Sequence, residues 1–288
     1  MPTLDEKTIQ DFDNQWTRYD DNDGWYASLD LFSDIVSPLL DKDDFAGKRV
    51  VDIGSGTGRI VGMLLESGAS HVYAVEPAPG AFEKLKNNVA SMEHGADVTF
   101  LNKRGDDWKV NIPVDYVISI GVIEFISEPN ATVKRCYDAL KPGGEIFFWL
   151  CSYEGNELYL GLIQPLRKFT TFLPHFVLTI IVQLLYGAMC IYRLACKFLP
   201  LPLKQYIDKI WWPMSSKKRR LIIYDQLNPT YLKYYRKHEA IALLEHAGFQ
   251  DVEIHHRHGY SWSVKGKKSQ ASYLPELTNR GNSSPKTE

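Results

Sequence analysis

Three glycines at alternate positions follow a short apolar run near residue 50. The segment Val50–Gly58 reads Val-Val-Asp-Ile-Gly-Ser-Gly-Thr-Gly. Glycines let the backbone turn sharply and approach a ligand without a clash at Cβ. A helix that begins just beyond them offers free N–H groups to a polar ligand. The loop is therefore predicted to bind a nucleotide-like ligand, with a plain strand-to-helix turn as the alternative.

The spacing of the glycines separates two classes of ligand. The nicotinamide-dinucleotide fingerprint G-x-G-x-x-G, counted from Gly54, requires a third glycine where this chain has Arg59. Glu76 stands 24 residues beyond Asp52, at the end of the next apolar run. A carboxylate there can accept both ribose hydroxyls of an adenosine ligand, unless it is a solvent-exposed acid at a strand end. Hydrogen bonds to a charged acceptor are worth about 1.5–3 kcal/mol each.

The loop resembles the first motif of class I S-adenosylmethionine (SAM)-dependent methyltransferases, which reads roughly (V/L)(V/L)D-x-G-x-G-x-G. The resemblance covers about residues 48–151 and the last helix and strand pair. It implies SAM as cofactor, S-adenosylhomocysteine as product, Glu76 on the ribose and Asp106 near the adenine amino group. Asp107 is the neighbour that can replace Asp106, and a plain turn is the alternative to both. The cofactor-binding residues expected in this way are Asp52, Gly54, Ser55, Gly56, Gly58, Glu76, Pro77, Asp106, Asp107, Ile120 and Gly121.

Strands alternate with helices around this loop. Apolar runs predict the strands, and glycine or proline ends the helices between them. Such alternation indicates βαβ units and a mostly parallel sheet. The resemblance implies an α/β, Rossmann-like fold of seven strands, with an antiparallel last strand. The predicted strands are 48–53, 71–75, 98–101, 115–120, 145–151, 252–258 and 260–264. The predicted parts are an N-terminal helical cap (1–47), a SAM-binding core (48–151), a hydrophobic and basic helical insertion (152–230), a final helix and strand pair (231–265) and a disordered tail (266–288).

The insertion contains a long stretch without Asp, Glu, Lys or Arg, from Phe169 to Tyr192. As a helix it would be about 36 Å long, and a bilayer core is about 30 Å thick. A crossing would place two halves of one sheet on opposite sides of the membrane. Residues 169–201 are therefore expected to lie in the membrane interface, with a buried lid or a dimer contact as the alternative. The flanking basic residues that favour an anionic surface are Arg167, Lys168, Arg193, Lys197, Lys217, Lys218, Arg219 and Arg220. Aspartates at Leu178 and Ile181 are expected to release the chain from membranes.

Transfer of a methyl group to oxygen requires a base near the acceptor. The candidates are Glu124, Tyr19, Tyr224, Asp225, His256 and His258. Each has a structural alternative, because aromatic side chains pack cores and histidines on strands are usually surface residues. Trp16 and Tyr19 either cap the cofactor pocket or pack the N-terminal helix on the sheet.

Composition restricts the partners. Lys and Arg number 33 against 35 Asp and Glu, so the net charge of -2 gives no sign of a nucleic-acid binder. None of the four cysteines forms a Cys-x-x-Cys pair, so no metal is expected. The first thirty residues lack the pattern of a signal peptide, which predicts a cytoplasmic protein or one peripheral on the inner face of the membrane.

The sequence thus predicts methyl transfer from SAM to a small, lipidic or saccharide-linked acceptor, at oxygen. Three segments, Gln15–Tyr19, Tyr224–Pro229 and His256–Trp262, resemble a bacterial methyltransferase subgroup that we associate with polysaccharide or lipid modification. The alternatives are a non-catalytic SAM-binding or membrane scaffold and a nicotinamide-dependent oxidoreductase on a similar fold.

Overall fold

A computed structural model describes residues 2–16, 22, 24–92, 94–201 and 204–270. Seven strands form one sheet in the order β3-β2-β1-β4-β5-β7-β6. Neighbours from β3 to β5 are parallel, whereas β7 runs antiparallel to both β5 and β6. The predicted α/β, Rossmann-like sheet is confirmed. The strands are β1 (Arg49–Ile53), β2 (His71–Val75), β3 (Val98–Leu101), β4 (Val114–Ile120), β5 (Leu140–Cys151), β6 (Gln250–Arg257) and β7 (Ser261–Lys267).

Alternate residues of the central strands enter two different cores, because successive side chains of a strand point to opposite faces. Val50 and Phe147 pack with α2 and α3 on one face. Val51 and Phe148 pack with α5 and α10 on the other. The helices that cover the sheet are α2 (Leu29–Val36), α3 (Arg59–Glu66), α4 (Pro79–Ala90), α5 (Asn130–Ala139) and α10 (Lys237–Glu245).

Strands β5 and β7, which pair with each other, are both longer than the apolar runs predict. Strand β5 already begins at Leu140, and β7 continues to Lys267, two residues beyond the predicted limit of the core. Polar residues remain in the ladder there because Glu145 of β5 pairs with Lys267. Backbone pairing, and not apolarity, therefore sets where these strands end.

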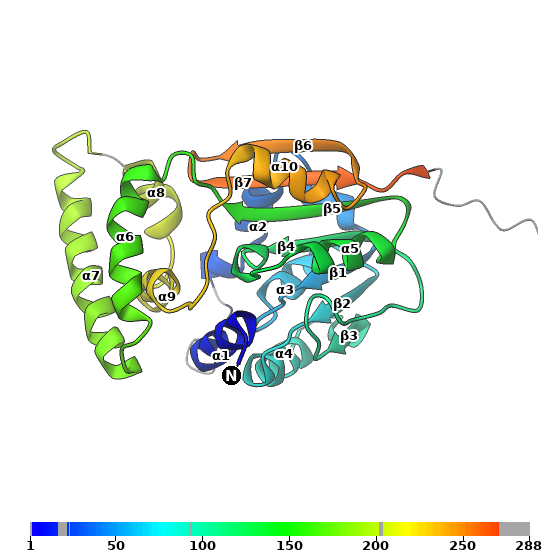
Figure 1. Cartoon of the computed structure of the whole chain (residues 1–288), viewed down its shortest axis with the longest axis horizontal. Coiled ribbons are helices and arrows are strands. Elements are labelled where there is room, and N and C mark those ends of the chain that lie inside the picture. Colours follow the sequence, from blue (N-terminus) through cyan, green and yellow to red (C-terminus); the bar gives the residue numbers. More distant parts are fainter. Residues whose placement is uncertain (1, 17–21, 23, 93, 202–203, 271–288) are drawn as a thin grey trace, which may run out of the picture.

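The elements of the insertion between β5 and α10 are helices in its described residues, and they gather at one end of the sheet (Figure 1). Leu178 and Val182 pack against Tyr224 and Leu227 in a small core of its own. The elements are α6 (Glu157–Thr170), α7 (His175–Ala195), α8 (Lys204–Tyr206), the π-helical turn η5 (Ile207–Trp211) and α9 (Ser216–Leu227). The isolated bridge between Ser152 and Tyr235 joins the two ends of this insertion.

The N-terminal helix α1 (Leu4–Trp16) lies near the edge where β1 and β2 end, between α4 and the insertion (Figure 1). Asp13 accepts a hydrogen bond of 2.5 Å from the backbone of Gly80 in α4. Asp11 accepts bonds of 2.8 and 2.6 Å from the backbone and hydroxyl of Thr230, just after α9. The helix is thus tied to the core on one side and to the insertion on the other.

Candidate active site

The glycine loop connects β1 to α3 at the point where the strand order reverses. Gly54 and Gly58 have φ angles of +74° and +92°, which L side chains rarely adopt. A Cβ at Gly54 would also lie 2.4 Å from the Val122 side chain. The backbone N–H of Gly54 donates to the carbonyl of Val75 in β2 at 2.8 Å, which fixes the loop against the neighbouring strand. Ligands of open α/β sheets bind at such a reversal, outside the carboxyl ends of the strands.

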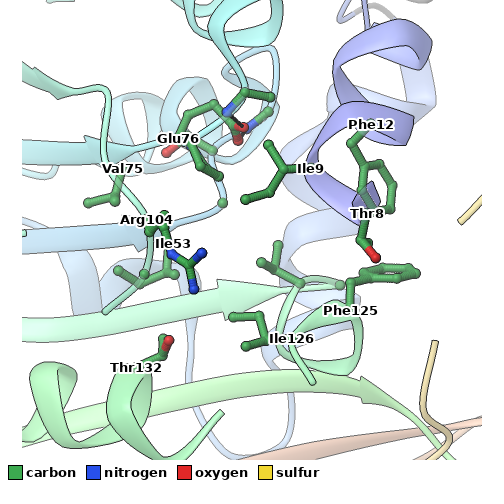
Figure 2. A pocket seen from close by; sticks show the side chains of 18 of the residues that line it. Thr8, Ile9, Phe12, Ile53, Val75, Glu76, Arg104, Phe125, Ile126 and Thr132 are labelled. Atoms are coloured by element: carbon green, nitrogen blue, oxygen red, sulfur yellow. Dashed lines mark hydrogen bonds between the residues drawn. The ribbon is translucent and has the colours of Figure 1, made fainter. Parts of the chain in front are cut away.

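A cavity of about 280 Å³ occupies this position. Its walls come from the glycine loop, the end of β2, residues 104–106, the segment after β4 and helix α1. Figure 2 shows side chains of α1 and of the strand ends around the same space. Of the cofactor-binding residues predicted from sequence, those that line the cavity are Gly54, Ser55, Gly56, Glu76, Pro77, Asp106, Ile120 and Gly121. Those that do not are Asp52, Gly58 and Asp107.

Glu76 lies in the cavity wall just beyond β2 and is only 5 % exposed. One carboxyl oxygen accepts a bond of 2.8 Å from the backbone N–H of Gly56, and the other accepts one of 2.8 Å from Ala78. These bonds fix the orientation of the carboxyl group and leave lone pairs on both oxygens for a ligand. Burial raises the pKa of Glu76 to about 7, while the two backbone donors oppose that rise.

Two other predicted carboxylates differ sharply in their surroundings. Asp52 is buried beneath the glycine loop, and its Oδ2 has no hydrogen-bond partner in the described part of the chain. Burial raises the pKa of Asp52 to about 7. Asp107 points into solvent and pairs with Lys103 at 3.2 Å. Its neighbour Asp106 lines the cavity and accepts a bond of 3.1 Å from Arg104.

Helix α1 supplies the wall opposite the strand ends. Ile9 and Phe12 face the cavity, and the Phe12 ring meets Phe125 edge-on at 4.7 Å between centroids (Figure 2). Trp16 lines the cavity beside the glycine loop. Sequence reasoning proposed Trp16 but missed Ile9 and Phe12. The available signal was the spacing Thr8-Phe12-Trp16, which places three side chains on one face of a helix.

Glu124 precedes Phe125 in the 3-10 turn η4 (Ile123–Phe125), which follows β4, but does not itself line the cavity. Its side chain is fully buried, and neither carboxyl oxygen has a hydrogen-bond partner among the described residues. Burial raises the pKa of Glu124 to about 7, and the neighbouring Cys151 opposes the rise. Phe125 reaches the cavity directly, whereas the side chain of Glu124 lies beside Cys151 at the end of β5.

Of the other predicted bases, Tyr224, Asp225, His256 and His258 do not line the cavity. Tyr19 lies outside the described residues. Tyr224 is buried between α7 and α9, where its hydroxyl lies 2.7 Å from His175 Nδ1. His258 occupies the turn between β6 and β7 and pairs with Asp34 at 2.8 Å. Successive residues of a helix point about 100° apart, so it is Asp225 that faces α1, and not Tyr224.

No group of three His, Cys, Asp or Glu side chains suited to a metal ion occurs among the residues that the structure describes. The polar groups that remain near the cavity are a carboxylate fixed by two backbone donors, a glycine loop and a buried carboxyl behind an aromatic wall. Such a set can hold an adenosine-like ligand and accept a proton beside it.

Comparison with known proteins agrees with this chemistry. Residues 50–144 match a protein family described as a methyltransferase domain. The ubiquinone biosynthesis O-methyltransferase of Neisseria meningitidis serogroup C is 26 % identical over 174 residues, which cover 59 % of this chain and 72 % of that protein. The protein of the same name from Pseudomonas entomophila is 26 % identical over 168 residues, covering 57 % and 70 %.

Solved structures share the fold. A SAM-dependent methyltransferase from Thermotoga maritima superposes with a TM-score of 0.51 at 16 % identity, over 91 % of this chain and all of that one (100 %). An O-methyltransferase family protein from Burkholderia thailandensis gives a TM-score of 0.51 at 12 % identity, over 91 % of this chain and 59 % of that one. The fold of the chain is thus that of a known architecture.

Proposed function

We propose that this chain, which is a class I SAM-dependent methyltransferase, transfers the methyl group of SAM to an oxygen atom of a small, largely apolar acceptor. The observation that carries the proposal is the apolar wall that α1 and the segment after β4 add to the cavity. Relatives that are 26 % identical to this chain over 168 to 174 residues are O-methyltransferases by name, which supports oxygen as the acceptor atom.

The described residues fit SAM. The carboxyl group of Glu76, aimed by Gly56 and Ala78, is suited to the ribose hydroxyls. Asp106 is suited to the adenine amino group. The backbone at Gly54 approaches closely because no Cβ is present, and Ile120 and Gly121 line the part of the cavity next to the acceptor wall. SAM supplies a methyl group on a positively charged sulfur, which leaves as a neutral thioether.

The acceptor side has two tasks, to exclude water and to take up a proton. Ile9, Phe12, Phe125 and Ile126 supply an apolar surface that excludes water from the reacting atoms. Glu124 is our candidate base because its carboxyl group is buried, has no hydrogen-bond partner among the described residues and titrates near neutrality. A lipidic acceptor fits the apolar wall better than a saccharide-linked one, which would leave hydroxyls facing Phe12 and Phe125.

Transfer of a radiolabelled methyl group from SAM tests this function. We expect product with a phenol that carries an alkyl tail and little product with a free monosaccharide. Calorimetry should show binding of SAM and S-adenosylhomocysteine and none of NAD. Tight binding of SAM without transfer to any hydroxyl compound would favour a non-catalytic scaffold, and preferential binding of NAD would favour an oxidoreductase.

We further propose that the insertion binds the surface of an anionic membrane. Helix α7 is, among the described helices, the one long and apolar enough to span a bilayer by length and composition. Its large side chains Phe176, Ile180, Leu184 and Ile191 recur at helical spacing, and each is more than half exposed. Helix α6 exposes a second stripe of the same kind. The remaining large apolar side chains exposed in the insertion are Leu158, Leu162, Phe169, Phe172, Leu194, Phe198 and Leu199.

A lipid surface suits this face better than a second protein because both stripes carry exposed cations at their ends. Lys168 and Lys197 remain exposed, and each lysine near an anionic surface contributes about 1 kcal/mol. Other basic residues expected to flank the stripe are engaged inside the protein. Arg167 donates to the Gln226 carbonyl at 2.8 Å, and Arg193 pairs with Asp208 at 3.2 Å. Binding should therefore depend more on apolar contact than on charge.

Sedimentation with vesicles tests the membrane proposal. The structure corrects one intended variant, because Leu178 is buried against Tyr224 and an aspartate there would disrupt the insertion. The better variant combines Ile180→Asp with Leu184→Asp on the exposed stripe. It should release the protein from phosphatidylglycerol vesicles without affecting SAM binding. The control is Ile112→Asp, a half-exposed apolar residue (49 %) far from the insertion in sequence. Absence of vesicle binding together with a dimer in solution would assign the face to a second copy of the chain.

A further inference from the structure

A cluster of polar side chains lies where the insertion meets the core, outside the walls of the described cavity. Elements far apart in the sequence contribute to it: η4, the end of β5, helices α6 and α9, and the segment before α10. Its members, which we call the junction cluster, are Glu124, Cys151, Tyr159, Arg167, Gln226 and Tyr234.

Gln226 holds the junction cluster together. Its side-chain oxygen accepts hydrogen bonds from the hydroxyls of Tyr159 at 3.0 Å and Tyr234 at 2.7 Å. Its backbone carbonyl accepts a bond of 2.8 Å from Arg167 Nε. Both tyrosine rings and the guanidinium group are therefore fixed in position by one residue of the Tyr224–Pro229 motif.

Two charged groups of the cluster have unused hydrogen-bonding capacity. Arg167 is 8 % exposed, yet its Nη2 has no hydrogen-bond partner in the described chain. Both carboxyl oxygens of the fully buried Glu124 also lack a bond of normal geometry, although the Cys151 thiol and the backbone at Cys151 and Val122 lie close enough to lower its pKa. A buried charged group left unpaired costs several kcal/mol. Because a donor and an acceptor are both left open, a ligand that satisfies both would remove the two penalties at once.

Glu124 and Arg167 lie near the same side chain, that of Cys151. The Cys151 thiol, at the end of β5, is subject to the charges of both Glu124 and Arg167. The cluster adjoins the wall of the cofactor cavity, since Glu124 directly precedes Phe125, which lines that cavity. On the other side, Gln15 donates to Asp225 beside the cluster, and the next residue, Trp16, lines the cavity.

We propose that the insertion supplies the acceptor-recognition site, in which Arg167 and Glu124 together bind an acidic hydroxyl group, that of a phenol or an enol. The proposal rests on the proposed methyl transfer. Glu124 accepts the hydroxyl proton, and the guanidinium group of Arg167 stabilises the oxyanion. Tyr159 and Tyr234, fixed by Gln226, lie beside the planar group that carries the hydroxyl.

The step balances without a further reactant. The acceptor oxygen forms a bond to the methyl carbon as the carbon–sulfur bond breaks, and that electron pair remains on sulfur. The hydroxyl proton goes to the Glu124 carboxylate and then to solvent. A phenol, with a reference pKa of about 10, is within reach of a base that titrates near neutrality. An aliphatic hydroxyl is a far weaker acid, which is why the site selects against it.

The experiment uses 4-nitrophenol as a probe, because its absorbance reports whether its hydroxyl is ionised. The full chain is first loaded with S-adenosylhomocysteine. We expect the bound probe to ionise at lower pH than the free probe. Arg167→Met should weaken probe binding at least tenfold and remove the spectral shift, while Arg167→Lys should retain part of both. Glu124→Gln should reduce the pH dependence of binding.

Two controls separate recognition from a structural role. Thr170→Val removes a bond of 2.9 Å from α6 to the Leu227 carbonyl and so loosens the same helix contact without touching the guanidinium group. Arg135→Met removes a cation from α5, outside the junction cluster. Both should leave the spectral shift intact. If Thr170→Val abolishes the shift as Arg167→Met does, the cluster is structural and the proposal is overturned.

Failure to bind the probe would also overturn it, as would an unchanged spectrum with Arg167→Met. These failures are distinguishable from failure of the proposed function. Methyl transfer to another oxygen acceptor, unaffected by Arg167→Met, would reject the recognition site alone. Absence of S-adenosylhomocysteine binding would reject the function as well.

Discussion

The glycine-loop site and the junction cluster each contain a buried carboxyl group, and the two groups differ in their hydrogen bonding. Glu76 is held by the backbone N–H groups of Gly56 and Ala78 before any ligand arrives. Glu124 is equally buried but has no hydrogen-bond partner among the described residues. The first arrangement presents a fixed acceptor to a cofactor of constant shape. The second leaves hydrogen-bonding capacity for an acceptor molecule. On this proposal the first site binds the cofactor, and the second selects the acceptor.

The largest effect should follow from breaking the first site. Glu76→Ala removes two proposed charge-assisted hydrogen bonds to the ribose, each worth about 1.5–3 kcal/mol. We expect the affinity for SAM to fall by about two orders of magnitude or more in calorimetry. Asp107→Ala should leave it unchanged, because that side chain faces solvent. Equal losses for the two variants would show that the ribose assignment is wrong.

A second test compares the two sides of α7. Leu178 is buried against Tyr224 and Leu227, whereas Leu184 on the opposite stripe is 70 % exposed. Leu178→Ala should lower the free energy of unfolding by about 2–4 kcal/mol. Leu184→Ala should change it by less than about 0.5 kcal/mol. Urea denaturation measures both, and equal losses would mean that the exposed stripe is covered in solution.

The junction cluster should appear in the pH dependence of stability. Burial raises the pKa of Glu124 from 4.5 to about 7 in the folded chain. The unfolded chain gives up this proton at lower pH, so the fold loses stability as the pH rises through about 7. The groups that act on Glu124 are the thiol of Cys151 and the backbone at Cys151 and Val122.

We therefore expect the melting temperature of the SAM-free wild type to fall between about pH 5 and pH 8. It should fall less in Glu124→Gln, which at pH 8 should be more stable than the wild type by about 1–3 kcal/mol. Asp52, Glu76 and Asp225 have pKa values raised in the same direction. They contribute equally to wild type and variant, so the difference between the two isolates Glu124. Parallel melting curves across the range would count against an ionising Glu124.

The smallest effect concerns an exposed ion pair at the rim of the first site. Lys103 and Asp107 lie 3.2 Å apart with both side chains more than half exposed. Lys103→Ala should change stability by less than about 0.5 kcal/mol, because exposed ion pairs are screened by solvent. A thermal melt at low salt, where screening is weakest, measures the largest stability loss that the Lys103→Ala change can cause. A larger loss would indicate that the 104–106 segment depends on this pair for its position.

The core was predictable from the sequence because its signals are local. The Val-Val-Asp run and the alternating glycines of Val50–Gly58 specify a buried strand and a tight turn without information from elsewhere in the chain. Glu76 follows in the same way, since strand β2 must end where the sheet meets the ligand. The seven-stranded sheet follows from the alternation of such runs with helices.

The acceptor side was not predictable because it depends on how distant elements rotate against one another. The Tyr224–Pro229 motif indicated the right segment, and Tyr224 and Asp225 were both candidate bases, but Gln226 was not singled out. The phase of α9 turns Tyr224 toward α7 and leaves Asp225 and Gln226 to meet α1 and α6. Arg167 appeared to be a cation at the edge of an apolar run, and only the fold shows that it points inward. The exposed stripe of α7 needed the same information, because its sequence is apolar on all sides.

The contact between Gln15 and Asp225 has a consequence for the order of events during synthesis. These residues are 210 positions apart, and they fasten the helix that forms one wall of the cofactor cavity. At about 5–20 residues per second, a ribosome needs roughly 10–40 s to travel from one to the other. The glycine loop has left the ribosome long before then, and helix α1 can already bond to Gly80 of α4, but its bond to Asp225 must wait. The wall of the cofactor cavity therefore gains its attachment to the insertion last, and a chain truncated within the insertion would hold α1 from the core side alone.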